Sequence, residues 1–245
     1  DVIYRGRELP WSTGKHGKSK ESIATSFSSW TKGFDLTVNI QTSEAERIYG
    51  EDWDNFLMSG KSMLGVEGGA SIFDFDGTLE IQMREFAENN PEADLFKYWS
   101  DHLEQFEGNV VHKTITPKIF EAIAARTALI LIPGEYSKLL EPFKHYIPLL
   151  ENGSNIKEVI EKLEDQEFID DLVETTYNEI AKREDLAFGF LVNKIDQILS
   201  ELQKISHVRT TETYFKERLT AEKVTAGKAL REKEEASQEI LELKH

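Results

Sequence analysis

The stretch TPKIFEAIAARTALILIPGEYSKLLEPFKHYIPL, residues 116–149, decides the fold. Thr116 and Pro117 are typical of a helix start, because threonine can accept a hydrogen bond from a first-turn amide and proline lacks the proton that would stay unpaired there. Apolar residues recur at helical spacing over 119–124, and the continuous apolar run 128–132 is typical of a strand buried on both faces of a parallel sheet. The stretch therefore predicts a helix followed by a buried strand.

The loop after this strand opens with Pro133 and Gly134, which end the apolar run. In open α/β sheets, ligands bind beyond the carboxyl ends of the strands. We therefore expect Glu135, Tyr136 and Ser137 to lie at a binding edge and to begin the next helix. Glu135 either hydrogen-bonds a ligand there or caps that helix.

The segments around this stretch continue the alternation of strands and helices. A mainly parallel sheet with helices on both faces follows from that order. We predict a Rossmann-like α/β domain over residues 1–205 and a C-terminal helical extension over 206–245. The other expected strands are 2–4, 34–40, 63–66 and 145–149, and the other expected helices are 23–30, 53–57, two within 79–107, 155–163, 165–181 and 186–205.

The composition limits the classes of function. A net charge of −16 argues against nucleic-acid binding, which depends on neutralising phosphates. No apolar run is long enough to cross a membrane, and no signal peptide is visible. Cysteine is absent, so disulfides and thiolate metal sites are excluded, and we expect a cytoplasmic protein. The chain begins with Asp1 rather than methionine, which is typical of a fragment.

Residues 1–20 are a basic exception in this acidic chain, with five basic and two acidic side chains. Gly14 and Gly17 lie in the basic segment that precedes the apolar part of the first helix. A glycine-containing basic loop at a helix N-terminus can hold a diphosphate through its amides and ammonium groups. We therefore expect Arg7, Lys15 and Lys20 to bind phosphate. A solvated basic loop without a ligand is the alternative.

A second glycine-containing loop, Glu67-Gly68-Gly69-Ala70-Ser71, follows the expected strand 63–66. Glycine allows a ligand to approach the backbone closely, so we expect Gly69 and Ser71 to contact the ligand. A tight turn with no ligand is the alternative.

The order of these motifs resembles the C-terminal half of GT-B-type glycosyltransferases, those related to the group-one and spore-maturation-type enzymes. The motif at 120–124, Phe-Glu-Ala-Ile-Ala, is similar to their helix pattern of a hydrophobic residue, Glu-Ala, a small residue and Ala. The resemblance covers residues 1–205 and implies that Glu121 binds the ribose of a nucleotide-sugar donor. The chain departs from the pattern at Lys113, where many relatives carry a second glutamate.

The resemblance implies transfer of a sugar from a nucleotide-diphosphate donor to an acceptor that this half does not specify. Stabilising the departing diphosphate is the main chemical task, and Lys113 or Lys118, near Thr116, can perform it without a metal or a cofactor. For Lys118 a surface ion pair with Glu121 is the alternative. In such enzymes the acceptor site usually lies in an N-terminal domain, so we expect that domain to be missing and the isolated half to be inactive.

Two other functions remain open. Residues 72–79, IFDFDGTL, resemble the opening motif of haloacid-dehalogenase-type phosphatases, in which Asp74 would be the nucleophile and Asp76 a general acid/base beside magnesium. That motif should end a buried strand, yet only two apolar residues precede Asp74. The other is a non-catalytic binding module with a vestigial donor site.

Overall fold

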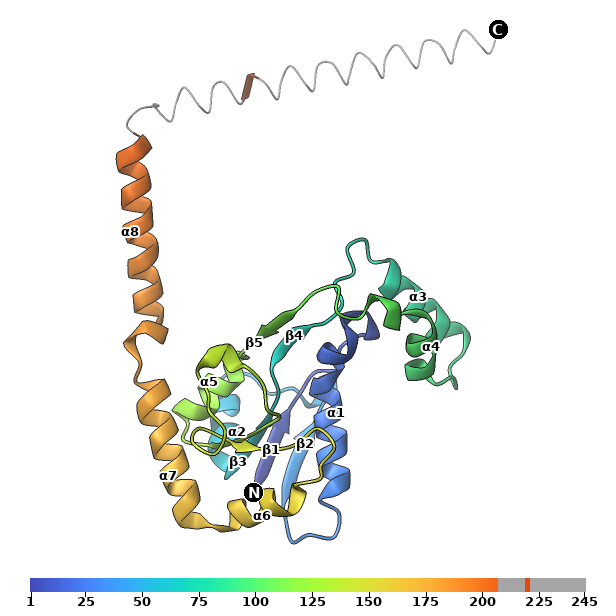
Figure 1. Ribbon diagram of the computed structural model, residues 1–245, viewed down its shortest axis with the longest axis horizontal. Coiled ribbons are helices and arrows are strands. Elements are labelled where there is room, and N and C mark those ends of the chain that lie inside the picture. Colours follow the sequence, from blue (N-terminus) through green and yellow to red (C-terminus); the bar gives the residue numbers. More distant parts are fainter. Residues whose placement is uncertain (207–218, 221–245) are drawn as a thin grey trace. The chain divides into compact units, whose positions relative to one another are not determined.

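The structure, a computed structural model, describes residues 1–206 and 219–220 and divides the chain into two compact units (Figure 1). The first unit is Asp1–Arg183, and the second begins at Glu184. The described part of the second unit contains a 3-10 turn, Glu184–Leu186, and helix α8, Phe188–Ser206. Apart from residues 206 and 219–220, the predicted extension 206–245 lies outside the described residues.

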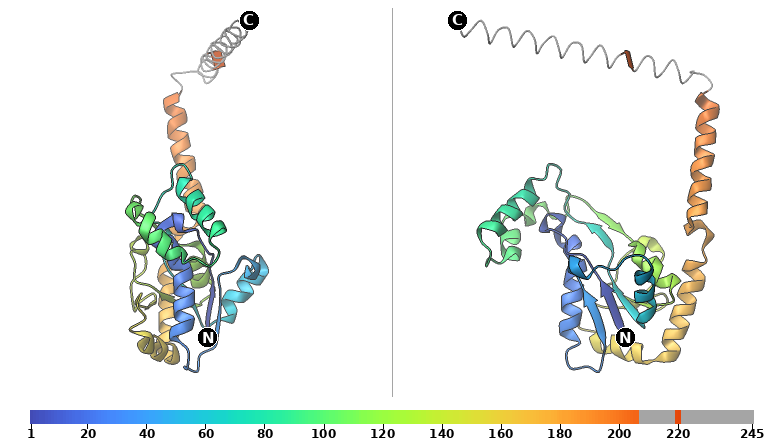
Figure 2. Two further views of the ribbon diagram at one scale, coloured as in Figure 1. Left: turned by 90° about the vertical axis from the view of Figure 1, so that its right-hand side faces the viewer. Right: turned by 180° about the vertical axis from the view of Figure 1, so that it is seen from behind.

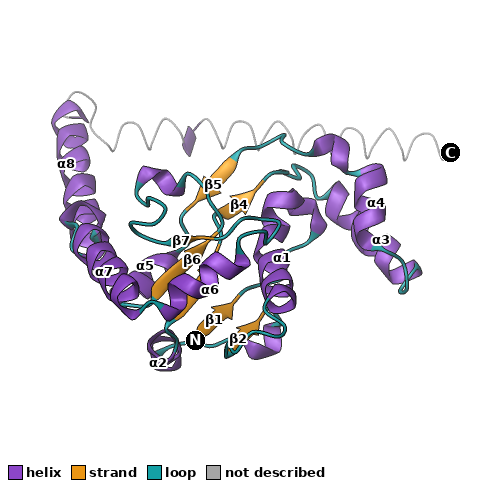
Figure 3. Ribbon diagram, turned by 60° about the horizontal axis from the view of Figure 1, so that its bottom comes forward, coloured by secondary structure: helices purple, strands orange, loops and turns teal. Residues whose placement is uncertain are grey.

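The first unit is built on a five-stranded sheet in which every neighbouring pair is parallel (Figure 3). The strand order is β2-β1-β3-β6-β7. The predicted Rossmann-like α/β fold is therefore confirmed. The strands are β1 (Val2–Arg5), β2 (Val38–Gln41), β3 (Ser62–Gly65), β6 (Ala128–Leu131) and β7 (Ile147–Pro148).

Helices cover both faces of this sheet, as the apolar strands require (Figure 2). One face packs against α1 (Gly14–Trp30), α6 (Ile156–Glu164) and α7 (Gln166–Thr176). The other packs against α2 (Glu51–Ser59) and α5 (Pro117–Ala124). Successive strand residues alternate between the two cores: Val2, Tyr4, Leu64, Ala128 and Ile130 belong to the first, and Ile3, Met63, Leu129 and Leu131 to the second.

A two-stranded antiparallel ribbon connects the sheet to a small helical lobe. Its strands are β4 (Gly68–Ala70) and β5 (His112–Thr114), and neither was predicted. Between them lie α3 (Thr78–Asn89) and α4 (Leu95–His102), which Figure 1 shows beyond the end of the ribbon. Ile72, Leu79, Met83, Trp99 and Leu103 form a separate core in this lobe.

Three local predictions were wrong. Thr116 occupies the N-cap position of α5 but makes no cap hydrogen bond, and its buried hydroxyl oxygen has no partner. The segment around Gly14 and Gly17, predicted as a loop, is already helical. The predicted helix after Gly134 is a single turn, Tyr136–Lys138, whose three residues have left-handed φ angles of 42°, 52° and 60°. Such angles end regular right-handed structure, because they place Cβ close to the backbone carbonyl.

Candidate functional site

The chain reverses its direction across the sheet between β1 and β3, because β2 lies on one side of β1 and β3 lies on the other. In doubly wound sheets such a switch point forms a crevice beyond the carboxyl ends of the strands, where ligands bind. A cavity of about 470 Å³ lies along this edge, between α1 and the segments that follow β3 and β6. Its size is within the range of small-molecule sites.

One flank of α1 lines the cavity with hydroxyl groups. Ser19, Ser22 and Ser26 are three and four residues apart, so helical geometry places them on one side. Ser19 donates its proton to the carbonyl of His16 at 2.7 Å, and Ser22 donates to the carbonyl of Lys18 at 3.1 Å. Their oxygen lone pairs remain available, so this flank can accept hydrogen bonds from ligand hydroxyl or amino groups.

His16 lines the same cavity in a fixed tautomer. Its Nε2 lies 3.0 Å from the carbonyl oxygen of Gly68, and a carbonyl can only accept, so Nε2 carries the proton. Its backbone amide donates to Ser71 Oγ at 3.0 Å. Among the described residues, nothing hydrogen-bonds to Nδ1. In its neutral form the ring therefore offers one free acceptor, Nδ1, in a cavity-lining side chain.

Glu67 is the buried carboxylate of the cavity and lies just beyond β3. Its Oε1 accepts the backbone amide of Tyr136 at 2.7 Å, which ties the left-handed turn after β6 to the end of β3. A Cβ at Gly134 would lie 2.6 Å from Oε2, so a side chain there would push the carboxylate aside. Left-handed conformations cost about 1–2 kcal/mol per residue in non-glycine residues and cluster at functional sites. Glu67 therefore holds the predicted binding loop in place.

Three cations gather at the carboxyl end of β1. Lys118 reaches there from α5: its Nζ donates to the carbonyl of Arg5 at 3.0 Å and lies 4.0 Å from the ring centre of Tyr4. Burial, and then the charge of Lys20, lower the pKa of Lys118 to about 7, although Glu121 acts in the opposite direction. Burial and the charge of Arg7 likewise lower the pKa of Lys20.

These three cations form no close ion pair in the part of the chain that the structure describes. Among the described residues, no carboxylate forms an ion pair with Arg7, Lys20 or Lys118. The arrangement costs folding free energy, because Lys20 and Lys118 are partly buried and lie near other positive charges, which disfavours their charged forms. In a chain of net charge −16, such an unpaired cluster is typical of a site for an anion.

The predicted phosphate ligands fall into two groups. Lys15 and Lys113 line the cavity, whereas Arg7, Lys20 and Lys118 form the cation cluster at β1. Arg7 also lines a shallower hollow beside the ends of β1 and β2. All five cations therefore lie along the carboxyl edge of the sheet, although they do not meet in one cavity.

Other predicted residues have partners within the protein. Glu121 does not line the cavity: its Oε2 accepts the indole N–H of Trp53 at 2.8 Å. Ser71 accepts the His16 amide. A Cβ at Gly69 would lie 1.8 Å from the carbonyl oxygen of His112, so the neighbouring strand already requires this glycine. Thr116 lies at the start of α5, close to Gly68.

The three predicted binding residues in the loop after β6 differ in their exposure to solvent. Glu135 and Ser137 are exposed, and Glu135 makes no cap hydrogen bond. Tyr136 is buried and donates its hydroxyl proton to the carbonyl of Ile132 at 2.7 Å. Burial raises the pKa of the Tyr136 hydroxyl, so this side chain remains a neutral donor.

Sequence reasoning missed Glu67, His16 and the serines of α1. A signal for Glu67 was present, because it is the first polar residue after a buried strand. The serine spacing was also visible, but the spacing alone does not tell which side of the helix faces a cavity.

Asp74 and Asp76 lie in the lobe rather than at the end of a strand of the parallel sheet. Asp74 accepts the amide of Glu80, and Asp76 accepts the amide of Thr78, each at 3.0 Å. Hydrogen bonds from Thr78 lower the pKa of the Asp76 carboxyl. Within residues 1–206 and 219–220, no three His, Asp or Glu side chains are gathered in a way that could hold a metal ion.

No family model, curated protein or solved structure matches this chain. In the described part of the chain, no helix combines the length and the apolar character needed to cross a bilayer.

Proposed function

We propose that the first unit binds a nucleoside-diphosphate sugar at the carboxyl edge of its sheet, as the donor-binding half of a glycosyltransferase. The observation that carries the proposal is a ligand-sized cavity beside cations that form no ion pair among the described residues of a strongly acidic chain. Cavity and cations lie where ligands bind in doubly wound sheets. The motif resemblance at 120–124 adds the expectation of sugar transfer.

The diphosphate and the hydroxyl groups of such a donor have matching groups along this edge. The diphosphate supplies negative charge for the cations of this edge, which are Lys15 and Lys113 in the cavity and Arg7, Lys20 and Lys118 beside β1. Ribose and sugar hydroxyls are donors that a buried carboxylate and serine oxygens can accept, so Glu67 and the α1 serines suit them. In this assignment Glu67 takes the hydroxyl-binding role that the resemblance gives to Glu121.

Transfer requires that negative charge on the departing diphosphate be stabilised. Fixed cations at the edge of the sheet would provide this stabilisation without reorganising during the reaction. The acceptor and the base that activates it are assigned to a separate domain, so the first unit is expected to bind donor with little turnover.

A thermal-shift panel of UDP, GDP, ADP and CMP tests the proposal. A ligand at 100 times its dissociation constant adds about 2.7 kcal/mol to the unfolding free energy. That corresponds to a rise in Tm of roughly 5–10 °C for a domain of this size. We expect Glu67→Gln and Lys20→Met to reduce the shift, and Lys157→Met, which removes an exposed lysine from α6, to leave it unchanged.

Glu121→Gln separates the two assignments of the hydroxyl-binding carboxylate. An unchanged shift supports Glu67, and a lost shift supports Glu121. No shift with any nucleotide contradicts the proposal. Magnesium-dependent release of phosphate that Asp74→Asn abolishes would support the phosphatase alternative instead.

A further inference from the structure

The small lobe, residues 71–109, has a core of its own, and Trp11, which lies just before α1, packs against that core. Its connections to the sheet run through the β4–β5 ribbon. Gly69, in the ribbon, and Gly108, at the end of the lobe, have φ angles of +123° and +82°, which favour glycine. The lobe is also tied to the segment before α1, because the amides of Ser71 and Ile72 donate to the carbonyl of Thr13 at 3.0 and 3.3 Å.

Carboxylates of this lobe contact the first turn of α1. Glu107 Oε2 accepts the backbone amide of Lys15 at 3.2 Å, and Glu104 Oε1 accepts a hydrogen bond from Lys15 Nζ at 2.6 Å. First-turn amides have no partner within their helix and carry its positive dipole end. Lys15 therefore presents its amide and its ammonium group to two carboxylates of the lobe.

The same groups belong to the cavity. Lys15, Glu107 and Lys113 all line it. A phosphate entering at this end would need the Lys15 amide and ammonium groups, because these are the donors that anions take at helix N-termini. Glu107 and a phosphate cannot accept the same amide proton together without strong repulsion between their charges. Ligand and lobe therefore compete for Lys15.

We propose that the small lobe is an autoinhibitory element: Glu107 and Glu104 hold Lys15 in the free protein, and the phosphate group of the ligand displaces them. This inference rests on the proposed function, because it requires a phosphate-bearing ligand in the cavity. Binding then frees the two carboxylates from Lys15. Affinity is reduced by the fraction of molecules in which the lobe blocks Lys15, and weakening that contact raises affinity.

Isothermal titration of the first unit within the full chain tests this inference, with UDP, GDP, ADP and inorganic pyrophosphate as probes. Glu107→Gln keeps the shape of the side chain and removes its charge, and we expect it to tighten binding five- to tenfold. Glu104→Gln, which changes an exposed side chain, is expected to act in the same direction by two- to threefold. Glu88→Gln on α3 removes the same charge from an exposed position of the lobe and is the matched control.

Hydrogen exchange supplies a second readout. We expect bound ligand to increase exchange in residues 104–107 while protecting the first turn of α1. Tighter binding in Glu107→Gln than in Glu88→Gln supports the inference, as does binding that appears only in Glu107→Gln. Equal or weaker binding in Glu107→Gln overturns it, and if that variant does not fold, Glu104→Gln decides by the same criterion. Absence of binding to every probe in wild type and all variants overturns the proposed function itself.

Discussion

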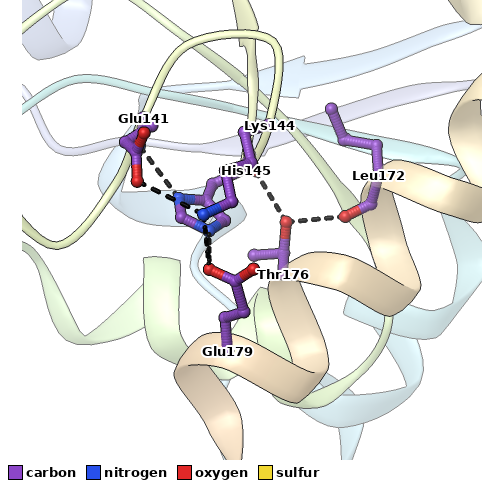
Figure 4. Close-up of polar contacts among 6 residues, drawn as sticks. All are labelled: Glu141, Lys144, His145, Leu172, Thr176 and Glu179. Atoms are coloured by element: carbon purple, nitrogen blue, oxygen red, sulfur yellow. Dashed lines mark hydrogen bonds and ion pairs between the residues drawn. The ribbon is translucent and has the colours of Figure 1, made fainter.

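Two histidines in the first unit differ in how many of their ring nitrogens are hydrogen-bonded within the protein. His145 is buried, and both of its ring nitrogens are paired: Nδ1 accepts the amide of Glu141 at 2.9 Å, and Nε2 donates to Glu179 at 3.1 Å (Figure 4). His16 pairs only Nε2, with a carbonyl, and its free Nδ1 belongs to a residue that lines the cavity.

The contrast extends to the surroundings of each histidine. Around His145, Lys144 forms an ion pair with Glu179 at 2.8 Å, and Thr176 donates to the His145 and Leu172 carbonyls (Figure 4). At the carboxyl edge, by comparison, Lys118 and Lys20 form no ion pair with a carboxylate among the described residues. Buried polar groups are normally satisfied, so a complete cluster belongs to the fold and an incomplete one indicates a ligand.

His145→Ala is expected to have the largest effect on stability. It leaves the amide of Glu141 without its acceptor and opens a cavity at a buried position, which together cost about 3 kcal/mol of unfolding free energy. Urea denaturation measures this loss. His102→Ala, at an exposed position of α4, is the control and should change stability by less than about 1 kcal/mol. A loss below about 1 kcal/mol for His145→Ala would contradict the structural role.

Lys118→Met changes one of the cations at the carboxyl edge, where the polar groups are not fully paired. It should stabilise the protein by about 2 kcal/mol at pH 8. The folded protein lowers the pKa of Lys118 to about 7 from 10.5, so the unfolded chain binds more protons between those values. The contribution of Lys118 to unfolding free energy therefore becomes more favourable as pH rises from about 7 to 10.5. Urea denaturation at pH 7, 8 and 9 should show this slope in wild type and a smaller slope in the variant.

The same substitution should weaken nucleotide binding, because it removes a cation of the edge. Lys157→Met serves again as the control, with neither effect expected. A Lys118→Met protein that is less stable than wild type, with the same dependence on pH, would show that the amine is an ordinary structural lysine.

The sequence predicted the parts of this contrast that depend on local pattern. The run Ala128–Leu131 is uniformly apolar, so a strand buried on both faces followed directly. The basic character of residues 1–20 likewise placed Arg7, Lys15 and Lys20 at the edge of the sheet, since the first strand ends there. Strands β4 and β5 were missed because Gly-Gly-Ala and His-Lys-Thr carry no apolar alternation.

The partners of individual side chains depend on contacts between distant segments. Trp53, which donates to Glu121, is 68 positions away, and the Tyr136 amide that Glu67 accepts is 69 positions away. No local pattern distinguishes a carboxylate that faces a tryptophan from one that faces a cavity. The same holds for the two histidines. Whether a ring nitrogen is paired, as both are in His145, or free, as Nδ1 is in His16, depends on which distant segments pack against it.

His16→Ala should have the smallest effect on stability, about 1 kcal/mol, because it removes one hydrogen bond to the Gly68 carbonyl at a half-buried position. Its effect on nucleotide affinity should be larger, a five- to tenfold loss, since the variant removes the free acceptor of a cavity-lining residue. The pair His16→Ala and His145→Ala therefore deletes the same side chain in two settings, measured by urea denaturation and by nucleotide titration. If both variants lose stability equally and bind nucleotide equally, pairing of ring nitrogens does not separate ligand-binding from structural histidines in this protein.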